Sequence, residues 1–134
     1  MTIRHPFTAC AVAAALVLCG AAAGALAAPD CKNAMNTLEI NECASIEQKA
    51  VEARLNQVYQ RVLKTLDGEG RDSAATRAKL VAAQRAWVRF READCDAVYE
   101  RHAGGTIRTV MYIGCMQSHA EQRIKALEAF AETY

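Results

Sequence analysis

The stretch QRAWVRFREADC, residues 84–95, decides how this chain folds. It holds the only tryptophan of the sequence, and four of its residues follow one another at steps of three, four and four: Gln84, Trp87, Arg91 and Cys95. This spacing places the four side chains on one face of an α-helix, and the tryptophan and the cysteine indicate that the face points inward. We predict that the strip is the inner face of a central helix and that its polar residues are structural.

A buried guanidinium needs hydrogen-bond acceptors, because an unpaired charge inside a protein is costly. Carbonyl groups at a neighbouring helix end, or a carboxylate, would supply these partners to Gln84 and Arg91. The candidate carboxylates are Glu39, Glu42 and Glu47. A second interpretation places Arg91 in a groove, where it would bind an acidic group of another molecule.

The N-terminal residues are typical of an export signal. Arg4 precedes an uncharged, alanine-rich run over residues 6–28, and the sequence Ala25-Leu26-Ala27 matches the pattern after which signal peptidase cleaves. The run is too rich in small residues for a membrane-spanning helix. We therefore predict a cleavable signal peptide over residues 1–27 and a periplasmic or secreted domain over residues 28–134, with no stable membrane insertion after cleavage.

Two cysteines in or near the apolar run suggest a lipoprotein as the alternative. However, Leu18 is too bulky for the residue that precedes a lipidated Cys19, and Cys10 comes too early in the sequence. We expect no lipid anchor.

Composition narrows the range of partners. Cleavage would remove Arg4 and no acidic residue, so the 15 acidic residues of the whole sequence would be balanced by basic ones. A domain of zero net charge, without a block of like charge, is a poor partner for nucleic acid or for an anionic membrane. We predict neither.

The distribution of glycine and proline divides the domain into three helical segments. No proline follows Pro29, and glycines gather at residues 68–70 and 104–105. Asn36 and Glu39 fit a capping-box start, and the first helix, of roughly 28 residues, would stop near Gly68. The second helix would begin after Ser73 and run to about residue 102, and the third would run from about residue 106 to 130.

Each segment carries an apolar stripe at helical spacing. The stripes comprise Val51, Leu55, Val58, Tyr59, Val62, Leu63 and Leu66 in the first; Leu80, Ala83, Trp87, Phe90 or Arg91, Asp94 and Val98 in the second; and Ile107, Val110, Met111, Ile124, Leu127 and Phe130 in the third. Gly114 would mark close packing or a kink. Short connections favour antiparallel neighbours, so the predicted fold is all-α, a three-helix antiparallel arrangement.

The domain retains an even number of cysteines, which in a small exported chain indicates two disulfides: Cys31, Cys43, Cys95 and Cys115. Their spacing leaves all three connectivities open. We prefer the local pairs, Cys31 with Cys43 and Cys95 with Cys115, because the Gly104-Gly105 turn needs a clamp and the segment before the first helix needs an anchor.

The sequence does not point to catalysis, to a metal or to a cofactor. The domain keeps only His102 and His119, and oxidised cysteines cannot supply the thiolates of a zinc site. Ser118 lies beside His119, but adjacent helical residues point about 100° apart, and no orienting acid is implied. We predict that the protein is not an enzyme.

The connection between the second and third helices has a composition suited to recognition. We name residues 102–108 the hinge, and its candidate contact residues are His102, Gly104, Gly105, Thr106 and Arg108. The acidic residues of the preceding helix form a second candidate patch: Glu92, Asp94, Asp96 and Glu100. The alternative is a plain interhelix turn beside a solvated helix face.

The order and spacing of these residues resemble the small exported bacterial domains of the LprI-type lysozyme inhibitors. The resemblance covers nearly all of residues 28–134 and rests on Cys31, Ala34, Glu39, Cys43, Leu55, Asn56, Tyr59, Gln84, Arg85, Ala86, Trp87, Arg91, Cys95, Gly104, Gly105, Thr106, Ile107, Cys115, Arg123 and Leu127. Two positions depart from the family pattern, where Glu52 replaces aspartate and Ala120 replaces threonine. The loss of the threonine hydroxyl bears on the hydrogen bonding around Arg123.

The resemblance implies a disulfide-stapled helical domain outside the cytoplasm that inhibits a lysozyme. Our leading hypothesis is steric occlusion of the lysozyme cleft, with the hinge as the contact. The alternative is a non-catalytic adaptor or structural module of the cell envelope, whose partner would be another envelope protein.

Overall fold

The computed structural model describes residues 29–69 and 73–133 of the chain. The predicted signal peptide over residues 1–27 lies outside these residues. They form three helices, α1 (Thr37–Gly68), α2 (Ala74–Arg101) and α3 (Arg108–Thr133). The all-α prediction is confirmed. No helix in the described part of the chain has the length and apolar character needed to span a bilayer.

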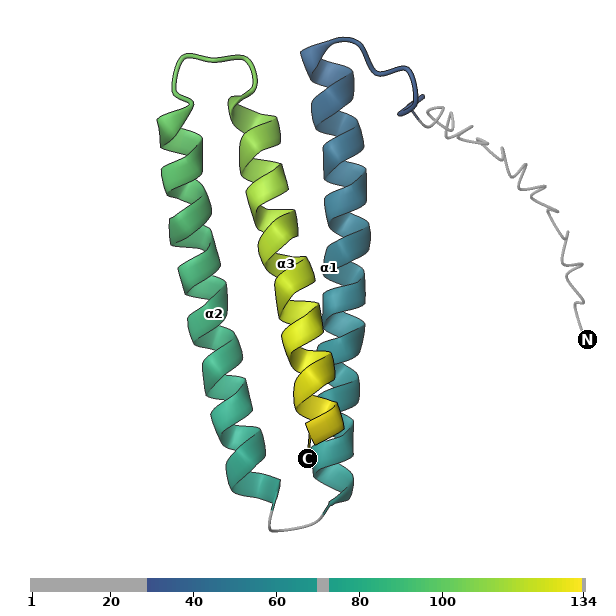
Figure 1. Cartoon of the computed structure of the whole chain (residues 1–134), viewed down its shortest axis with the longest axis vertical. Helices are drawn as coiled ribbons and strands as arrows, with labels where there is room; N and C mark the ends of the chain where they lie inside the picture. Colours follow the sequence, from purple (N-terminus) through teal and green to yellow (C-terminus); the bar gives the residue numbers. More distant parts are fainter. Residues whose placement is uncertain (1–28, 70–72, 134) are drawn as a thin grey trace, which may run out of the picture.

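The three helices lie side by side as an up-and-down bundle (Figure 1). Both α1 and α3 run in one direction and α2 returns between them in sequence, so the starts of α1 and α3 lie at the same end of the molecule as the hinge. Helix α3 packs more extensively on α1 than on α2. The bundle therefore presents one end where the hinge and two helix N-termini come together.

Helix α1 begins where the sequence predicts a capping box. The side chain of Asn36 accepts a hydrogen bond from the Glu39 amide at 3.0 Å, and Glu39 Oε2 accepts one from the Met35 amide at 3.0 Å. These two bonds satisfy main-chain donors that the helix itself cannot pair. The bond from Met35, followed by the contact with Asn36, lowers the pKa of the exposed Glu39 carboxyl.

Aliphatic side chains from all three helices form the core. It comprises Leu55, Val58, Val62, Leu63, Leu66, Leu80, Ala120, Ile124 and Leu127. The predicted α1 stripe is confirmed, with Val51 and Tyr59 packed at its margin. Ala120, which stands where the family pattern has threonine, is fully buried where α3 meets the core, and it places no hydroxyl there.

Several predicted positions on α2 and α3 are wrong. Arg91, not Phe90, is the buried alternative, and Phe90 is 58% exposed. Other residues of the predicted stripes that are exposed are Ala83, Asp94, Ile107 and Met111. In their place α3 buries Ile113 and Met116, which continue the face of Ala120, Ile124 and Leu127 at steps of three and four. Gly114 has nothing within 4 Å of an added Cβ, so close packing does not explain it.

Candidate functional site

The polar residues of the central strip are held inside the bundle. Arg91 is only 7% exposed, and its Nη1 donates a hydrogen bond to Glu52 Oε1 on α1. The guanidinium also lies 4.6 Å from the centre of the Trp87 ring. This geometry gives Arg91 a structural role that joins α1 to α2.

The carboxylate that receives Arg91 is not one of the three predicted acceptors. Glu39, Glu42 and Glu47 all lie nearer the start of α1 than Glu52 does. Although α1 ends at Gly68 as the sequence predicts, the register of α2 against α1 places Glu52 opposite Arg91. Glu52, which departs from the family pattern, is thus the partner of Arg91 in the ion pair that joins the strip to α1.

Gln84 continues this polar row to α3. Its Oε1 accepts a hydrogen bond of 2.8 Å from Arg123 Nε, whereas the prediction paired Gln84 with a helix-end carbonyl or a carboxylate. The Arg123 guanidinium lies 5.9 Å from the centre of the Trp87 ring, and burial lowers its pKa. Trp87 therefore stands near two guanidinium groups, and the row crosses all three helices as part of the architecture.

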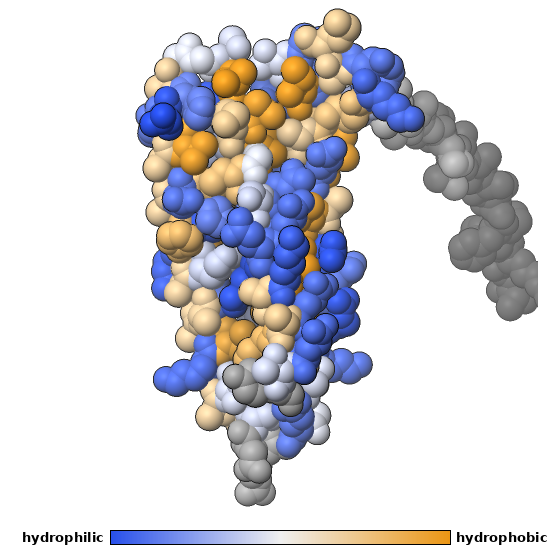
Figure 2. Space-filling view, in the orientation of Figure 1, coloured by the Kyte–Doolittle hydropathy of each residue, from blue (hydrophilic) through white to orange (hydrophobic). Residues whose placement is uncertain are grey.

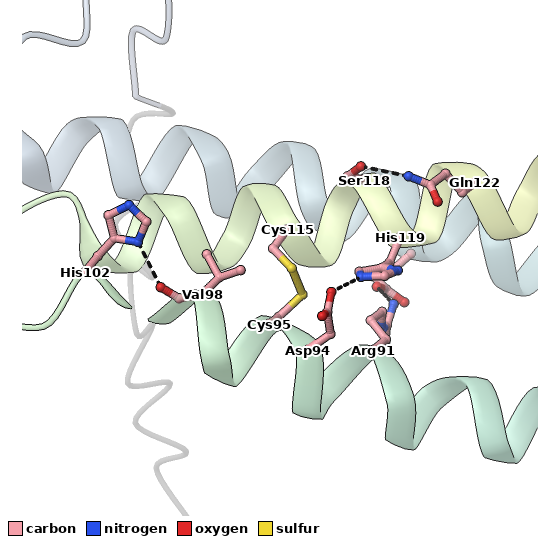
Figure 3. The surroundings of a disulfide bond; sticks show 10 residues. Arg91, Asp94, Cys95, Val98, His102, Cys115, Ser118, His119 and Gln122 are labelled. Atoms are coloured by element: carbon pink, nitrogen blue, oxygen red, sulfur yellow. Dashed lines mark hydrogen bonds and ion pairs between the residues drawn. A yellow bond between two sulfur atoms is a disulfide. The ribbon is translucent and has the colours of Figure 1, made fainter. Parts of the chain in front are cut away.

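The two disulfides form the preferred pairs. Cys31 is joined to Cys43, and Cys95 to Cys115, with Cα–Cα separations of 5.5 Å and 5.6 Å. The first bond anchors the segment that precedes α1. The second crosses from α2 to α3, as Figure 3 shows, and Cys95 has no exposed surface.

A histidine and an acid lie beside the second disulfide (Figure 3). His119 Nε2 lies 2.8 Å from Asp94 Oδ2, so an orienting acid exists that the sequence did not reveal. The register of α2 against α3, set by the disulfide, brings the two residues together. Ser118 instead accepts a hydrogen bond from Gln122 at 3.2 Å, so the Ser-His-acid arrangement of a hydrolase is not assembled.

The same region has the spacing of a metal site but not its chemistry. Ligand atoms of Cys95, Cys115 and His119 lie within 4.8 Å of one another. The two sulfur atoms are bonded to each other, whereas a zinc site requires thiolates. In the oxidised protein this cluster is a crosslink between helices.

The hinge turns sharply, and the polar side chains at its two ends, His102 and Arg108, bond to residues of α2. Gly104 has a φ of +84°, a conformation that glycine adopts without strain. The ring Nδ1 of His102 lies 2.8 Å from the Val98 carbonyl oxygen. Arg108 donates from Nε to the Tyr99 carbonyl at 3.1 Å and from Nη2 to Glu100 at 2.6 Å. The candidate contact residue Arg108 therefore folds back on α2, while Gly104, Gly105 and Thr106 stay exposed.

Large apolar side chains are exposed near the hinge. Met35 and Leu38 are 89% and 77% exposed at the start of α1, and Ile107 and Met111 are 52% and 40% exposed at the start of α3. We name these four residues together with the hinge the end face. Figure 2 shows apolar groups gathered at this end of the molecule. Met35 and Leu38 fall outside the predicted apolar stripe of α1, but that position alone does not predict their exposure.

The residues of the family pattern divide into structural and exposed sets. Leu55 is in the core, Tyr59 packs at its margin, and Asn56 is exposed on α1. Trp87, Arg91 and Arg123 belong to the polar row described above. The structure thus assigns most of the pattern to folding, and the exposed end face is left as the candidate site.

Comparisons with known proteins agree with the fold and the pattern. The family profile described as Lysozyme inhibitor LprI matches residues 28–127. An uncharacterized protein of Rhizobium meliloti (strain 1021) is 28% identical over 112 residues, which cover 78% of this chain and 81% of the relative.

A solved structure is similar in fold. It is the crystal structure of a DUF1311 family protein from Pseudomonas putida KT2440, with a TM-score of 0.66 and 18% sequence identity. The match covers 74% of this chain and 100% of the other. At this identity the similarity supports the three-helix fold.

Proposed function

The chain belongs to the LprI family of lysozyme inhibitors, and we propose that it inhibits a lysozyme by covering the substrate cleft with its end face. The mechanism is steric and needs no reacting residue. The observation that carries the proposal is the exposure of Met35 and Leu38, at 89% and 77%, on a segment that a disulfide anchors. Exposed apolar side chains on a rigid support are typical of protein-binding surfaces.

The position of Met35 supports this interpretation. A hydrophobic residue directly before an N-cap commonly packs on the fourth helical residue, which here is Ile40. Met35 is instead almost fully exposed, and Ile40 is itself 39% exposed. The fold therefore does not use the Met35 side chain, which remains available to a partner.

The charges around the end face suit a cationic partner. Many lysozymes are strongly basic, and this domain is neutral overall, so attraction has to come from local acidity. Three acids lie on the first turns of α1 beside the exposed apolar residues: Glu39, Glu42 and Glu47. An uncharged tip with acids set behind it would enter the substrate cleft while the acids face the basic surface around it.

Export supports the same function, because a lysozyme inhibitor must meet its target outside the cytoplasm. Both cysteine pairs are oxidised in the fold, and such crosslinks persist in an oxidising compartment. We infer that residues 1–27 direct the chain to the periplasm or beyond.

The direct test is titration of oxidised residues 28–134 into chicken-type and goose-type lysozymes while cell-wall lysis is followed. We expect saturable inhibition of at least one lysozyme at about equimolar domain. Unchanged lysis by both enzymes at high micromolar domain would contradict the proposal. The adaptor hypothesis would then lead, and pull-down from envelope extracts would test it.

A double substitution tests the end face itself. Met35→Gln with Leu38→Gln keeps the charge and the helix cap but removes the apolar tip, so we expect the inhibition constant to rise roughly 30-fold. The matched control is Phe90→Gln, which alters another exposed apolar residue, 58% exposed, on α2 away from this end. Equal inhibition by the double variant and the wild type would remove the end face as the contact.

A further inference from the structure

A groove between α2 and α3 lies next to the hinge. It has a volume of about 300 Å³ and is lined by Asp96, Tyr99, Thr109 and Tyr112. Tyr99 and Tyr112 are half-buried and meet edge to face with ring centres 5.8 Å apart. The groove therefore has two aromatic side chains and one carboxylate in its lining.

Asp96 brings a free negative charge to this groove. It is exposed, and it has neither an ion pair nor a hydrogen bond with any other side chain that the structure describes. The neighbouring Asp94 and Glu100 are engaged by His119 and Arg108. Asp96 is thus the acid of the hinge end of α2 whose charge is available to another molecule.

Beside the groove, the protein already binds one of its own guanidinium groups with an aromatic ring and a carboxylate. Arg108 lies with its guanidinium carbon 3.6 Å from the centre of the Tyr99 ring, and Glu100 neutralises it at 2.6 Å. An aromatic ring and a carboxylate together favour a guanidinium, because the ring face and the acid both attract positive charge. The groove repeats this pair of groups with Tyr112 and Asp96, but leaves the position of the cation open.

We propose that this groove receives an arginine side chain of the inhibited lysozyme, with Asp96 as the counter-charge and Tyr112 as the stacking surface. The proposal rests on the function proposed above and names the chemistry of its partner. The volume of the groove exceeds that of one arginine side chain, and the hydroxyl of Thr109 offers a further acceptor. Because Glu100 already neutralises Arg108, that nearby cation does not cancel the attraction of Asp96.

Removal of one charge tests the proposal. In the lysis assay we expect Asp96→Asn to raise the inhibition constant roughly tenfold and to slow association, with a smaller effect at high salt. Glu132→Gln is the matched control, because Glu132 is an exposed acid near the end of α3 that is remote from the hinge and lies outside the groove. Inhibition by Asp96→Asn equal to that of the control would overturn the proposal.

A second pair of variants separates the ring from the hydroxyl. Tyr112→Phe keeps the stacking surface and should inhibit like the wild type, whereas Tyr112→Leu should weaken inhibition to a similar extent as Asp96→Asn. Melting curves of all variants establish that each is folded. Equal inhibition by the leucine and phenylalanine variants would exclude stacking on Tyr112.

A binding experiment keeps the groove testable even if no lysozyme is inhibited. We expect arginine methyl ester at millimolar concentration to shift the amide resonances of Thr109 and Tyr112 in the wild-type domain and not in Asp96→Asn. Shifts in the wild type without inhibition would refute the lysozyme function but retain the cation site. The absence of shifts in the wild type would refute the site itself, whatever the inhibition assay shows.

Discussion

Substitution of Arg91 by alanine should lower the melting temperature by roughly 15 °C, which corresponds to about 3 kcal/mol of the unfolding free energy. The reason is that Arg91 is buried and Glu52, its ion-pair partner, has a side chain that is only 28% exposed. Without the guanidinium, a partly desolvated carboxylate loses its counter-charge and Trp87 loses a packing partner. Thermal unfolding followed by circular dichroism measures the effect.

The neighbouring Arg89 provides the matched control. It is exposed on the same helix two residues earlier, so Arg89→Ala should change stability by less than about 0.5 kcal/mol. The double variant Arg91→Ala with Glu52→Ala should be more stable than Arg91→Ala alone, because it removes the stranded carboxylate. A melting temperature of Arg91→Ala equal to that of the wild type would show that the strip is not structural.

The strip also shows how far the sequence can lead. Helical spacing and residue type were sufficient to place Gln84, Trp87 and Arg91 on an inner face, because these properties are local to one helix. The partner of Arg91 is not local, because it depends on the register of α2 against α1. Glu47 and Glu52 lie five residues apart, or about one and a half helical turns, so a modest shift in this register changes which carboxylate faces Arg91.

The candidate site was predicted only in its general position. Glycine at 104 and 105 located the hinge, but nothing in the sequence indicated that Arg108 folds back onto Tyr99 and Glu100. Exposure of Met35 and Leu38 was equally hidden, since it depends on how the segment before α1 is held. The groove at Asp96 arises from two helices at once, so neither helix alone reveals it.

Removal of the two disulfides should have separable effects on stability and on inhibition. Cys95→Ala with Cys115→Ala should lower the unfolding free energy by about 3–5 kcal/mol, because the bond closes a 20-residue separation and Cys95 has no exposed surface. The bond also fixes α2 against α3 on both sides of the hinge. We expect a large drop in melting temperature, with inhibition retained at temperatures where the variant is folded.

Cys31→Ala with Cys43→Ala should affect stability less and inhibition more than the loss of the other disulfide. Its 12-residue separation would give a similar loss in a model of chain entropy alone. However, the segment before α1 contributes no residue to the core, so without the bond it can detach while the helices stay packed. The conformational entropy that the folded protein gains offsets much of the entropy that the unfolded chain gains. The melting temperature should therefore fall by only a few degrees, which corresponds to about 1 kcal/mol of unfolding free energy.

Inhibition should respond more strongly to this second pair, because Met35 lies between the two cysteines in sequence. Only the main chain of Met35 is held by the helix cap, so a released segment would have to be ordered again when it binds, and the inhibition constant should rise roughly tenfold. The comparison needs both double variants in both assays, melting and lysis. If the Cys31 and Cys43 variant inhibited as well as the wild type while its segment was shown to be mobile by amide exchange, the anchored apolar tip would not be the element that binds. If the Cys31 and Cys43 variant lost as much stability as the Cys95 and Cys115 variant, the segment before α1 would be part of the cooperative fold. The exposure of Met35 would then need an explanation in folding as well as in binding.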